Sequence, residues 1–345
     1  MLPRRLDRGL TRPARKQPLP LLLTLMALLV PSPTRAASAP GTGYRTLVVR
    51  DPVGGGSAVG VAYYPSRVRV AGQRVGPYAI DAAAGAPVSA GRFPLVAFSH
   101  GSAGSRWSSH DLATALARRG YIVATLEHPG DSYRDRRGVG TDRVLVGRAL
   151  QMSSLVDAVL ADPRLRSHVD AAKIGAAGFS AGGYTALLLA GARPNFGLLR
   201  SYCRTNADDS EFCGGWRVAL SRPPLRAKRD PRVRAVLALA PVGIYFDRSS
   251  LAGVRVPVDL WAASADRVLR PAANAERIRA LLHPSQYHLV KGADHDVFLA
   301  PCTPVQAAAE RTLCYDPPGV DRRAVHAAIV DDAARFFRRA FASGQ

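Results

Sequence analysis

Continuous apolar runs alternate along the chain with segments of helical period. The runs at 93–101 and 121–130 end in polar turns, which is typical of strands buried on both faces. Between them, segment 110–120 has apolar residues at helical spacing and ends in Gly120. The run 173–179 predicts another strand, and 181–192 the helix after it. Further strands are expected at 233–241, 257–266 and 285–295, and further helices at 142–161, 274–282 and 323–341.

This alternation predicts an α/β fold. Strands that alternate with helices require right-handed crossovers, so the central sheet should be mostly parallel with helices on both faces. An antiparallel pair, 44–51 and 57–65, should precede it, with glycines 54–56 as the turn. In such a sheet, functional groups gather at the carboxyl ends of the strands.

One stretch departs from the alternation. Segment 193–230 is polar and irregular and carries two cysteines, so we interpret it as an insertion over the active-site end of the sheet. Residues 37–345 should otherwise form one domain, because 345 residues suit one large domain better than two equal ones.

The N-terminus is typical of a signal peptide, residues 1–36. A basic segment precedes the apolar stretch 19–30, and Thr34-Arg35-Ala36 offers a cleavage site. The Arg4-Arg5 pair leaves both the general and the twin-arginine export routes open. No later stretch is expected to cross a membrane. We therefore expect a secreted or periplasmic protein without stable membrane insertion.

The charge of the chain does not point to nucleic acid. The formal net charge is +21, and the first 36 residues hold seven basic side chains and one acid, which is +6 of that total. The other basic residues are scattered and form no stripe with aromatic residues. With 47% hydrophobic and 21% charged residues, the composition is that of a globular protein. We expect no nucleic-acid partner, and the sequence leaves the oligomeric state open.

Four cysteines fall into two local pairs, and an oxidising compartment permits disulfides. Nearest-neighbour pairing predicts Cys203–Cys213 and Cys302–Cys314. Zinc ligation is the alternative, but no C-x-x-C motif or histidine cluster accompanies them. We expect neither a metal nor a cofactor.

Three residues lie at the ends of predicted strands and suggest a catalytic triad. Ser180 lies in Gly-Phe-Ser-Ala-Gly between a strand and a helix, Asp266 closes one strand, and His295 follows another. The order Ser, Asp, His is that of the α/β-hydrolase triad. Ser180 would be the nucleophile, His295 the general base, and Asp266 the acid that orients the imidazole. Alone, the Gly-x-Ser-x-Gly motif could equally be a turn of small residues.

An oxyanion hole is expected from two backbone N–H groups. One belongs to Ala181, directly after the nucleophile. We assign the other to Ser102, in the turn "FSHGSAGSR" that follows an early buried strand. A simple structural turn is the alternative there.

Other acids and histidines are weighed against the triad. Asp294 and Asp296 flank His295, but immediate neighbours project away from the imidazole, so we expect structural or loop-anchoring roles. Asp259 lies short of its strand end, which makes it a weaker candidate acid. His128 ends a strand, and it could line the cleft or be structural.

The motifs resemble those of a known family. The segments "PLVAFSHGSAGSR", "LATALARRGYIVATLEHPGDS", "VDAAKIGAAGFSAGGYTALLLAG" and "KGADHDVF" resemble the bacterial predicted dienelactone hydrolases, a group related to the platelet-activating factor acetylhydrolases. The resemblance covers most of the chain after the signal. It implies an α/β-hydrolase fold and a cofactor-free serine esterase with Ser180, Asp266 and His295 in the roles above. Its oxyanion loop matches the "FSHG" turn.

The resemblance also bears on the substrate. True dienelactone hydrolases are cytosolic and use a cysteine nucleophile, whereas this chain has serine and a signal peptide, so an ester other than a dienelactone is expected. The acetylhydrolase branch acts on short acyl chains of phospholipids, which suggests short-acyl or phospholipid-type esters and a role in lipid degradation. The alternatives are a peptidase or polyester hydrolase on the same scaffold, and a non-catalytic binding protein of the same fold.

Overall fold

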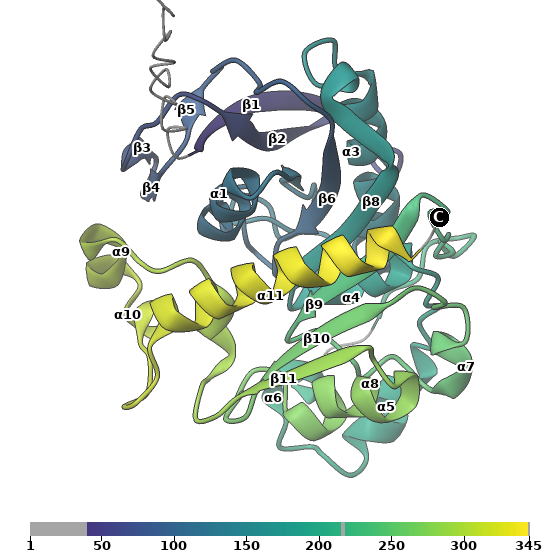
Figure 1. Cartoon of the computed structure of the whole chain (residues 1–345). Helices are drawn as coiled ribbons and strands as arrows, with labels where there is room; N and C mark the ends of the chain where they lie inside the picture. Colours follow the sequence, from purple (N-terminus) through teal and green to yellow (C-terminus); the bar gives the residue numbers. More distant parts are fainter. Residues whose placement is uncertain (1–39, 215–217, 344–345) are drawn as a thin grey trace, which may run out of the picture. The chain divides into compact units, whose positions relative to one another are not determined.

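Strands from most of the chain join in one sheet in the computed structural model, which describes residues 40–214 and 218–343. The predicted signal peptide, residues 1–36, lies outside these residues; the described ones belong to one unit, Ala39–Gln345. The nine strands follow the order β11-β10-β9-β8-β6-β7-β2-β1-β5 (Figure 1). Their bounds are β1 Gly41–Arg50, β2 Ser57–Ser66, β5 Ala83–Ala84, β6 Phe93–Ser99, β7 Ile122–Leu126, β8 Val169–Phe179, β9 Val233–Leu239, β10 Val258–Ala263 and β11 Gln286–Val290.

The sheet is mostly parallel, which confirms the predicted fold class. From β7 through β6, β8, β9 and β10 to β11, every neighbouring pair is parallel. The β1–β2 hairpin is antiparallel, and β2 also joins β7 antiparallel. The sequence pattern did not predict a second, two-stranded sheet of β3 (Gln73–Val75) and β4 (Tyr78–Ile80).

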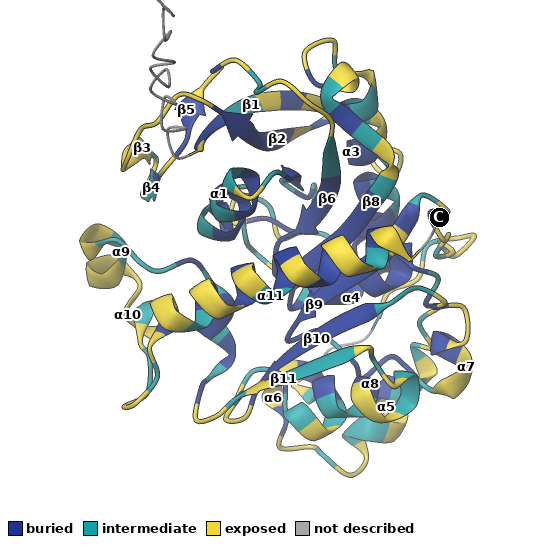
Figure 2. Cartoon of the chain, viewed as in Figure 1, coloured by how far each residue is buried: buried dark blue, intermediate teal, exposed yellow. Residues whose placement is uncertain are grey.

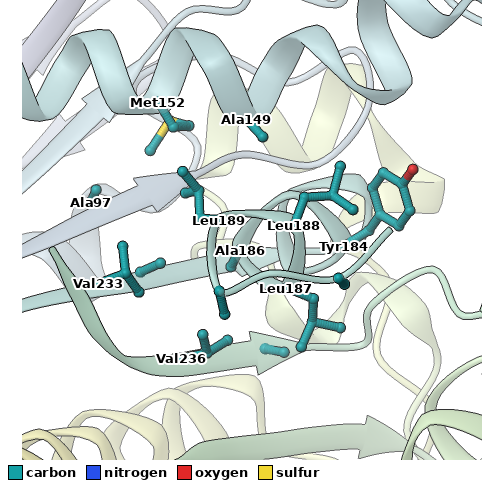
Figure 3. Packing of buried hydrophobic residues seen from close by; sticks show 14 of the residues in the cluster. Ala97, Ala149, Met152, Tyr184, Ala186, Leu187, Leu188, Leu189, Val233 and Val236 are labelled. Carbon is teal, nitrogen blue, oxygen red and sulfur yellow. The ribbon is translucent and has the colours of Figure 1, made fainter. Parts of the chain in front are cut away.

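Helices cover both faces of the sheet. One hydrophobic cluster joins the sheet to α3 (Gly147–Ala161), α4 (Ala181–Leu189) and α8 (Ala275–Leu282). The other joins the opposite face to α1 (His110–Arg118) and α11 (Arg322–Ala342). Helix α4 is buried along nearly its whole length (Figure 2), and its leucines lie between α3 and strand β9 (Figure 3). The central strands and α4 therefore hold Ser180 on a fixed scaffold.

Short helices occupy the connections between the main elements. They are α2 Asp142–Leu145, α5 Gly197–Cys203, α6 Ser210–Cys213, α7 Arg248–Leu251, α9 Pro304–Ala309 and α10 Arg311–Cys314, with 3-10 turns η1 Arg166–His168, η2 Pro271–Ala273 and η3 His295–Phe298. The turn η3 begins with the expected general base.

The helix expected over 142–161 needs two corrections. It divides into α2 and α3, because Val146 has φ −111° and interrupts the helix. The span Asp142–Ala161 is also long and apolar enough to cross a membrane, with a mean hydropathy of 1.4 over its best window, whereas the sequence analysis expected no such stretch. Just over half of that window is buried inside the protein, and α3 supplies Met152, Leu155 and Val159 to the core. A core helix meets the same criterion of length and hydropathy.

Candidate active site

Ser180 stands at a sharp bend between β8 and α4. Its backbone has φ 56° and ψ −119°, a region that residues with a side chain rarely occupy. Its N–H donates to the carbonyl of Leu239 on the neighbouring strand β9 at 2.8 Å, which holds the bend in place. The residue is 9% exposed. Backbone strain of this kind costs about 1–3 kcal/mol and concentrates at functional sites.

The two glycines of the motif are required by close packing. A Cβ atom on Gly182 would lie 1.9 Å from the carbonyl oxygen of Ser99, and one on Gly178 would lie 2.3 Å from the backbone of Gly182. Strand β6, the bend and the start of α4 therefore touch backbone to backbone. This packing explains why so little bulk surrounds Ser180.

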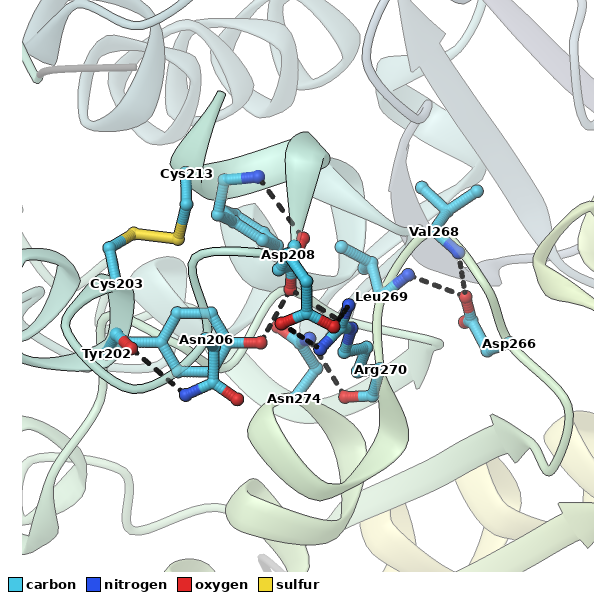
Figure 4. A network of polar contacts seen from close by, with 12 residues as sticks. Tyr202, Cys203, Asn206, Asp208, Cys213, Asp266, Val268, Leu269, Arg270 and Asn274 are labelled. Atoms are coloured by element: carbon cyan, nitrogen blue, oxygen red, sulfur yellow. Dashed lines mark hydrogen bonds and ion pairs between the residues drawn. A yellow bond between two sulfur atoms is a disulfide. The ribbon is translucent and has the colours of Figure 1, made fainter. Parts of the chain in front are cut away.

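Asp266 and His295 form a buried pair beyond the ends of β10 and β11. The Nδ1 atom of His295 lies 2.7 Å from Oδ2 of Asp266, and both side chains are at most 5% exposed. The other carboxylate oxygen accepts from the N–H groups of Val268 and Leu269, at 3.0 and 2.6 Å (Figure 4). The aspartate is thus fixed by its own loop. With Nδ1 donating to it, Nε2 of His295 is the nitrogen left to accept a proton.

The imidazole lies against the residue that precedes Ser180. The ring centroids of Phe179 and His295 are 4.7 Å apart, so the imidazole packs beside the bend. Among the hydrogen bonds of the described residues there is none between Ser180 and His295. Nucleophile–base contacts of this type often tighten only when substrate binds.

The flanking acids have other partners. Asp294 accepts from the N–H of His295 and from the backbone and guanidinium of Arg267, so it ties the loop of His295 to the loop of Asp266. Those hydrogen bonds and the Arg267 charge outweigh burial and lower the pKa of Asp294. Burial raises the pKa of Asp296. Asp259 is fully buried within β10, 3.3 Å from His288 Nε2.

The expected oxyanion donors lie on two segments that touch. A Cβ atom added to Gly101 would be 3.5 Å from Cβ of Ser180, so the turn before Ser102 adjoins the bend. The N–H of Ala181 opens α4 and has no acceptor within its helix. Neither this N–H nor that of Ser102 has a hydrogen-bond partner in the described part of the chain. Both donors are free for a ligand.

Behind this turn lies a buried polar network that the sequence did not reveal. Arg148 on α3 pairs with Asp131, and both side chains are at most 2% exposed. His128 is also fully buried and bonds to Ser99 and Gln151, so it is part of this network and does not line a cleft. No motif marked Asp131 or Arg148, because their significance comes from residues 17 or more positions away in the sequence.

The insertion 193–230 is attached to the loop of Asp266. Its Cys203–Cys213 disulfide encloses Asp208 and Asp209. Asp208 accepts from both terminal nitrogens of Arg270, at 3.3 and 2.9 Å (Figure 4). Arg270 directly follows Val268 and Leu269, whose N–H groups donate to the carboxylate of Asp266. The insertion therefore contacts the chain segment whose N–H groups hold the Asp266 carboxylate.

The remaining cysteines, Cys302 and Cys314, form the second disulfide. All four cysteines of the chain are thus bonded in the nearest-neighbour pairing, which leaves no thiolate for zinc. Residues 40–214 and 218–343 contain no cluster of three or more His, Cys, Asp or Glu that could hold a metal ion. The region beside Asp266 is lined mainly by apolar side chains such as Pro241, Ala263 and Leu269.

Comparisons with known proteins agree with this architecture. Residues 59–136 match the model of the family "Platelet-activating factor acetylhydrolase, isoform II". A search of curated proteins gave no match. Among 687 matching chains of solved structure is a ferulic acid esterase from Streptomyces cinnamoneus. The two chains superpose with a TM-score of 0.60 at 21% identity, over 90% of this chain and 92% of the esterase.

The structural match shows the fold, and the family match covers the segment that holds β6, the Ser102 turn and β7. The chain has an α/β-hydrolase fold and is similar over residues 59–136 to the isoform II platelet-activating factor acetylhydrolases.

Proposed function

We propose that the protein is an exported serine hydrolase that cleaves carboxylic esters through an acyl-enzyme. The observation that carries this proposal is the buried Asp266–His295 pair packed beside the strained bend of Ser180. An oriented histidine next to a strained bend that carries a serine is the arrangement that activates a serine hydroxyl. The names of the matched family, an acetylhydrolase, and of the similar structure, a ferulic acid esterase, support an ester as the substrate.

The proposed reaction has two halves. In the first, Oγ of Ser180 attacks the ester carbonyl as its proton passes to Nε2 of His295, and Asp266 stabilises the resulting imidazolium. The negative charge on the carbonyl oxygen is met by the N–H groups of Ser102 and Ala181. Collapse of the intermediate breaks the ester C–O bond, and the leaving alcohol takes the proton from His295. In the second half, water attacks the acyl-serine with His295 as base, and the carboxylic acid and the free Ser180 hydroxyl are regenerated.

Two disulfides suggest an extracellular location, because such bonds persist in oxidising compartments. We propose that residues 1–36 direct export and are removed, which leaves residues 37–345 as the mature domain.

The test is ester turnover by the purified mature protein. Acetyl, butyryl and octanoyl p-nitrophenyl esters, a feruloyl ester, a phospholipid, a peptide and a polyester would be compared. Ser180→Ala should lower ester turnover by about 10⁴-fold or more while the fold survives. The matched control is Ser201→Ala, at an exposed position on α5, which should keep wild-type turnover.

Other outcomes reject the proposal in distinct ways. Ester turnover retained by Ser180→Ala would remove the proposed nucleophile. Faster cleavage of peptide or polyester than of small esters would replace the substrate class but leave the triad. A wild type with no turnover of any substrate would favour a binding protein.

A further inference from the structure

A buried ion pair lies directly behind the turn that carries Ser102. Arg148 Nη1 is 2.6 Å from Asp131 Oδ2, with side-chain exposures of 2% and 1%. Asp131 lies in the loop between β7 and α2, and Arg148 lies in the first turn of α3. Neither residue belongs to the proposed triad. Replacing a buried ion pair by apolar residues often leaves protein stability unchanged or raises it. A gain in stability is therefore a weak explanation for the presence of this pair.

Asp131 binds the turn from one side. Its Oδ1 accepts from the N–H of Ala103 at 2.8 Å and from the hydroxyl of Ser102 at 2.8 Å. Burial opposes ionisation of this carboxyl, but Arg148 and these hydrogen bonds outweigh it and lower the pKa of Asp131. The carboxylate is thus charged, and both of its oxygens accept hydrogen bonds.

Arg148 binds the same segment at its other end. Its Nη2 donates to the hydroxyl of Ser99 at 2.9 Å and to the carbonyl oxygen of His100. Because Nη1 holds Asp131, one planar guanidinium spans the segment from Ser99 to Ala103. Such a fork fixes direction as well as distance.

Between these two anchors the turn has a strained conformation. Ala103 has φ 55°, and the turn closes with the N–H of Gly104 on the carbonyl of Gly101 at 3.1 Å. The N–H groups of Ala103 and Gly104 therefore already have acceptors within the protein, Asp131 and Gly101 respectively. The N–H of Ser102 has no partner within the described residues, and Gly101 adjoins Ser180.

We propose that Asp131 and Arg148 are positioning residues that hold the Gly101–Gly104 turn so that the Ser102 N–H faces the oxyanion formed at Ser180. This inference rests on the proposed esterase function and adds two residues to it. The pair acts through the turn and does not touch the substrate.

The test replaces Asp131 by Asn, which keeps the size of the side chain. The amide can accept from Ala103 or from Arg148, but its NH₂ group must then face another donor, and the buried guanidinium loses its counter-charge. The expected result is a fall in kcat of about 10²-fold, comparable to loss of one oxyanion donor, with KM changed by less than about threefold. The matched control is Asp135→Asn, in the same loop, where the carboxylate forms an exposed pair with Arg137. It should keep wild-type kinetics.

A trifluoromethyl ketone inhibitor separates positioning from simple loss of structure. This inhibitor adds to the serine and forms an oxyanion, so its Ki in Asp131→Asn should rise in step with the fall in kcat/KM. If Asp131 were only structural, a smaller fraction of molecules would react with a fluorophosphonate, while kcat per active molecule and Ki would stay at wild-type values. That result would overturn the inference.

Ser102→Ala serves if Asp131→Asn does not fold. It keeps the backbone N–H but removes one bond to Asp131 at an exposed position, and should lower kcat and weaken the ketone by about tenfold each. Unchanged values would reject the positioning role. If the wild type is active and Ser180→Ala is inactive, unchanged kinetics and inhibition in these variants reject the positioning role but leave the esterase proposal intact. A wild type without turnover or fluorophosphonate labelling rejects the esterase proposal and this inference together.

Discussion

At the scale of single residues, the space around Ser180 constrains the sequence most strongly. We predict that Gly182→Ala destabilises the protein by about 3 kcal/mol or more, because the added methyl group would overlap the backbone of Ser99. Denaturant unfolding measures the loss. Gly197→Ala is the control, since its Cβ would approach only the side chain of Asn195, at 3.2 Å, and should stay within about 0.5 kcal/mol of wild type. Equal stability of Gly182→Ala and wild type would contradict the close packing.

Single substitutions also test which aspartate orients His295. We predict that Asp266→Asn lowers kcat by about 10³- to 10⁴-fold, because an amide facing Nδ1 favours the wrong imidazole tautomer. Asp294→Asn should cost much less, since Asp294 bonds the backbone N–H of His295 and not its ring. Steady-state kinetics of the two variants decides. A larger loss of kcat in Asp294→Asn than in Asp266→Asn would contradict the assignment of Asp266 as the acid that orients His295.

At the scale of elements, His326 joins α11 to the turn η3, which begins with His295, the proposed general base. Nδ1 of His326 lies 2.5 Å from Oδ2 of Asp111 on α1, and its Nε2 lies 2.9 Å from the carbonyl of Val297 in η3. Both ring nitrogens face acceptors, so only the doubly protonated imidazolium satisfies both. Burial and Arg322 oppose the charge, but Asp111 and the Val297 carbonyl outweigh them and raise the pKa of His326.

This raised pKa predicts a pH-dependent stability. A group whose pKa is higher in the folded state stabilises fully below its unfolded pKa, about 6.5, and the contribution is lost as pH rises through the folded value. His326→Gln should therefore be less stable than wild type by about 1–3 kcal/mol at pH 6, and the difference should shrink at alkaline pH. Unfolding curves from pH 6 to 9 measure it, with His168→Gln as a control at a partly exposed histidine. A difference that grows with pH would contradict the account.

Most main elements could be predicted from the sequence, because buried parallel strands form short continuous apolar runs whereas the helices between them show helical spacing. The break at Val146 could not, since a continuous apolar pattern covers it. The hairpin of β3 and β4 was also missed: each strand has three residues, too few for a period to emerge. The proposed triad of Ser180, Asp266 and His295 could be suggested from the sequence because each residue lies at the end of a strand, and the structure pairs Asp266 with His295. The Asp131–Arg148 pair was not, because nothing local distinguishes a buried arginine from a surface one.

At the scale of the whole molecule, the two disulfides close loops with sequence separations of 10 and 12 residues. We predict that removing either bridge lowers the free energy of unfolding by about 2–3 kcal/mol, because short loops give the smaller share of disulfide stabilisation. The double variants Cys203→Ser/Cys213→Ser and Cys302→Ser/Cys314→Ser, unfolded in denaturant, measure each contribution. Titration of the unreduced protein with a thiol-specific reagent should find no free cysteine. Free thiols in protein purified from an oxidising compartment would contradict the pairing.

The central claim is that Ser180, activated by His295, is the nucleophile of this protein. The most direct measurement is reaction of the mature protein with a fluorophosphonate, followed by mass spectrometry of the intact chain and of its peptides. The account predicts one adduct per chain, located on Ser180, and labelling that is strongly slowed in His295→Ala. No adduct, an adduct on another residue, or undiminished labelling without His295 would contradict it.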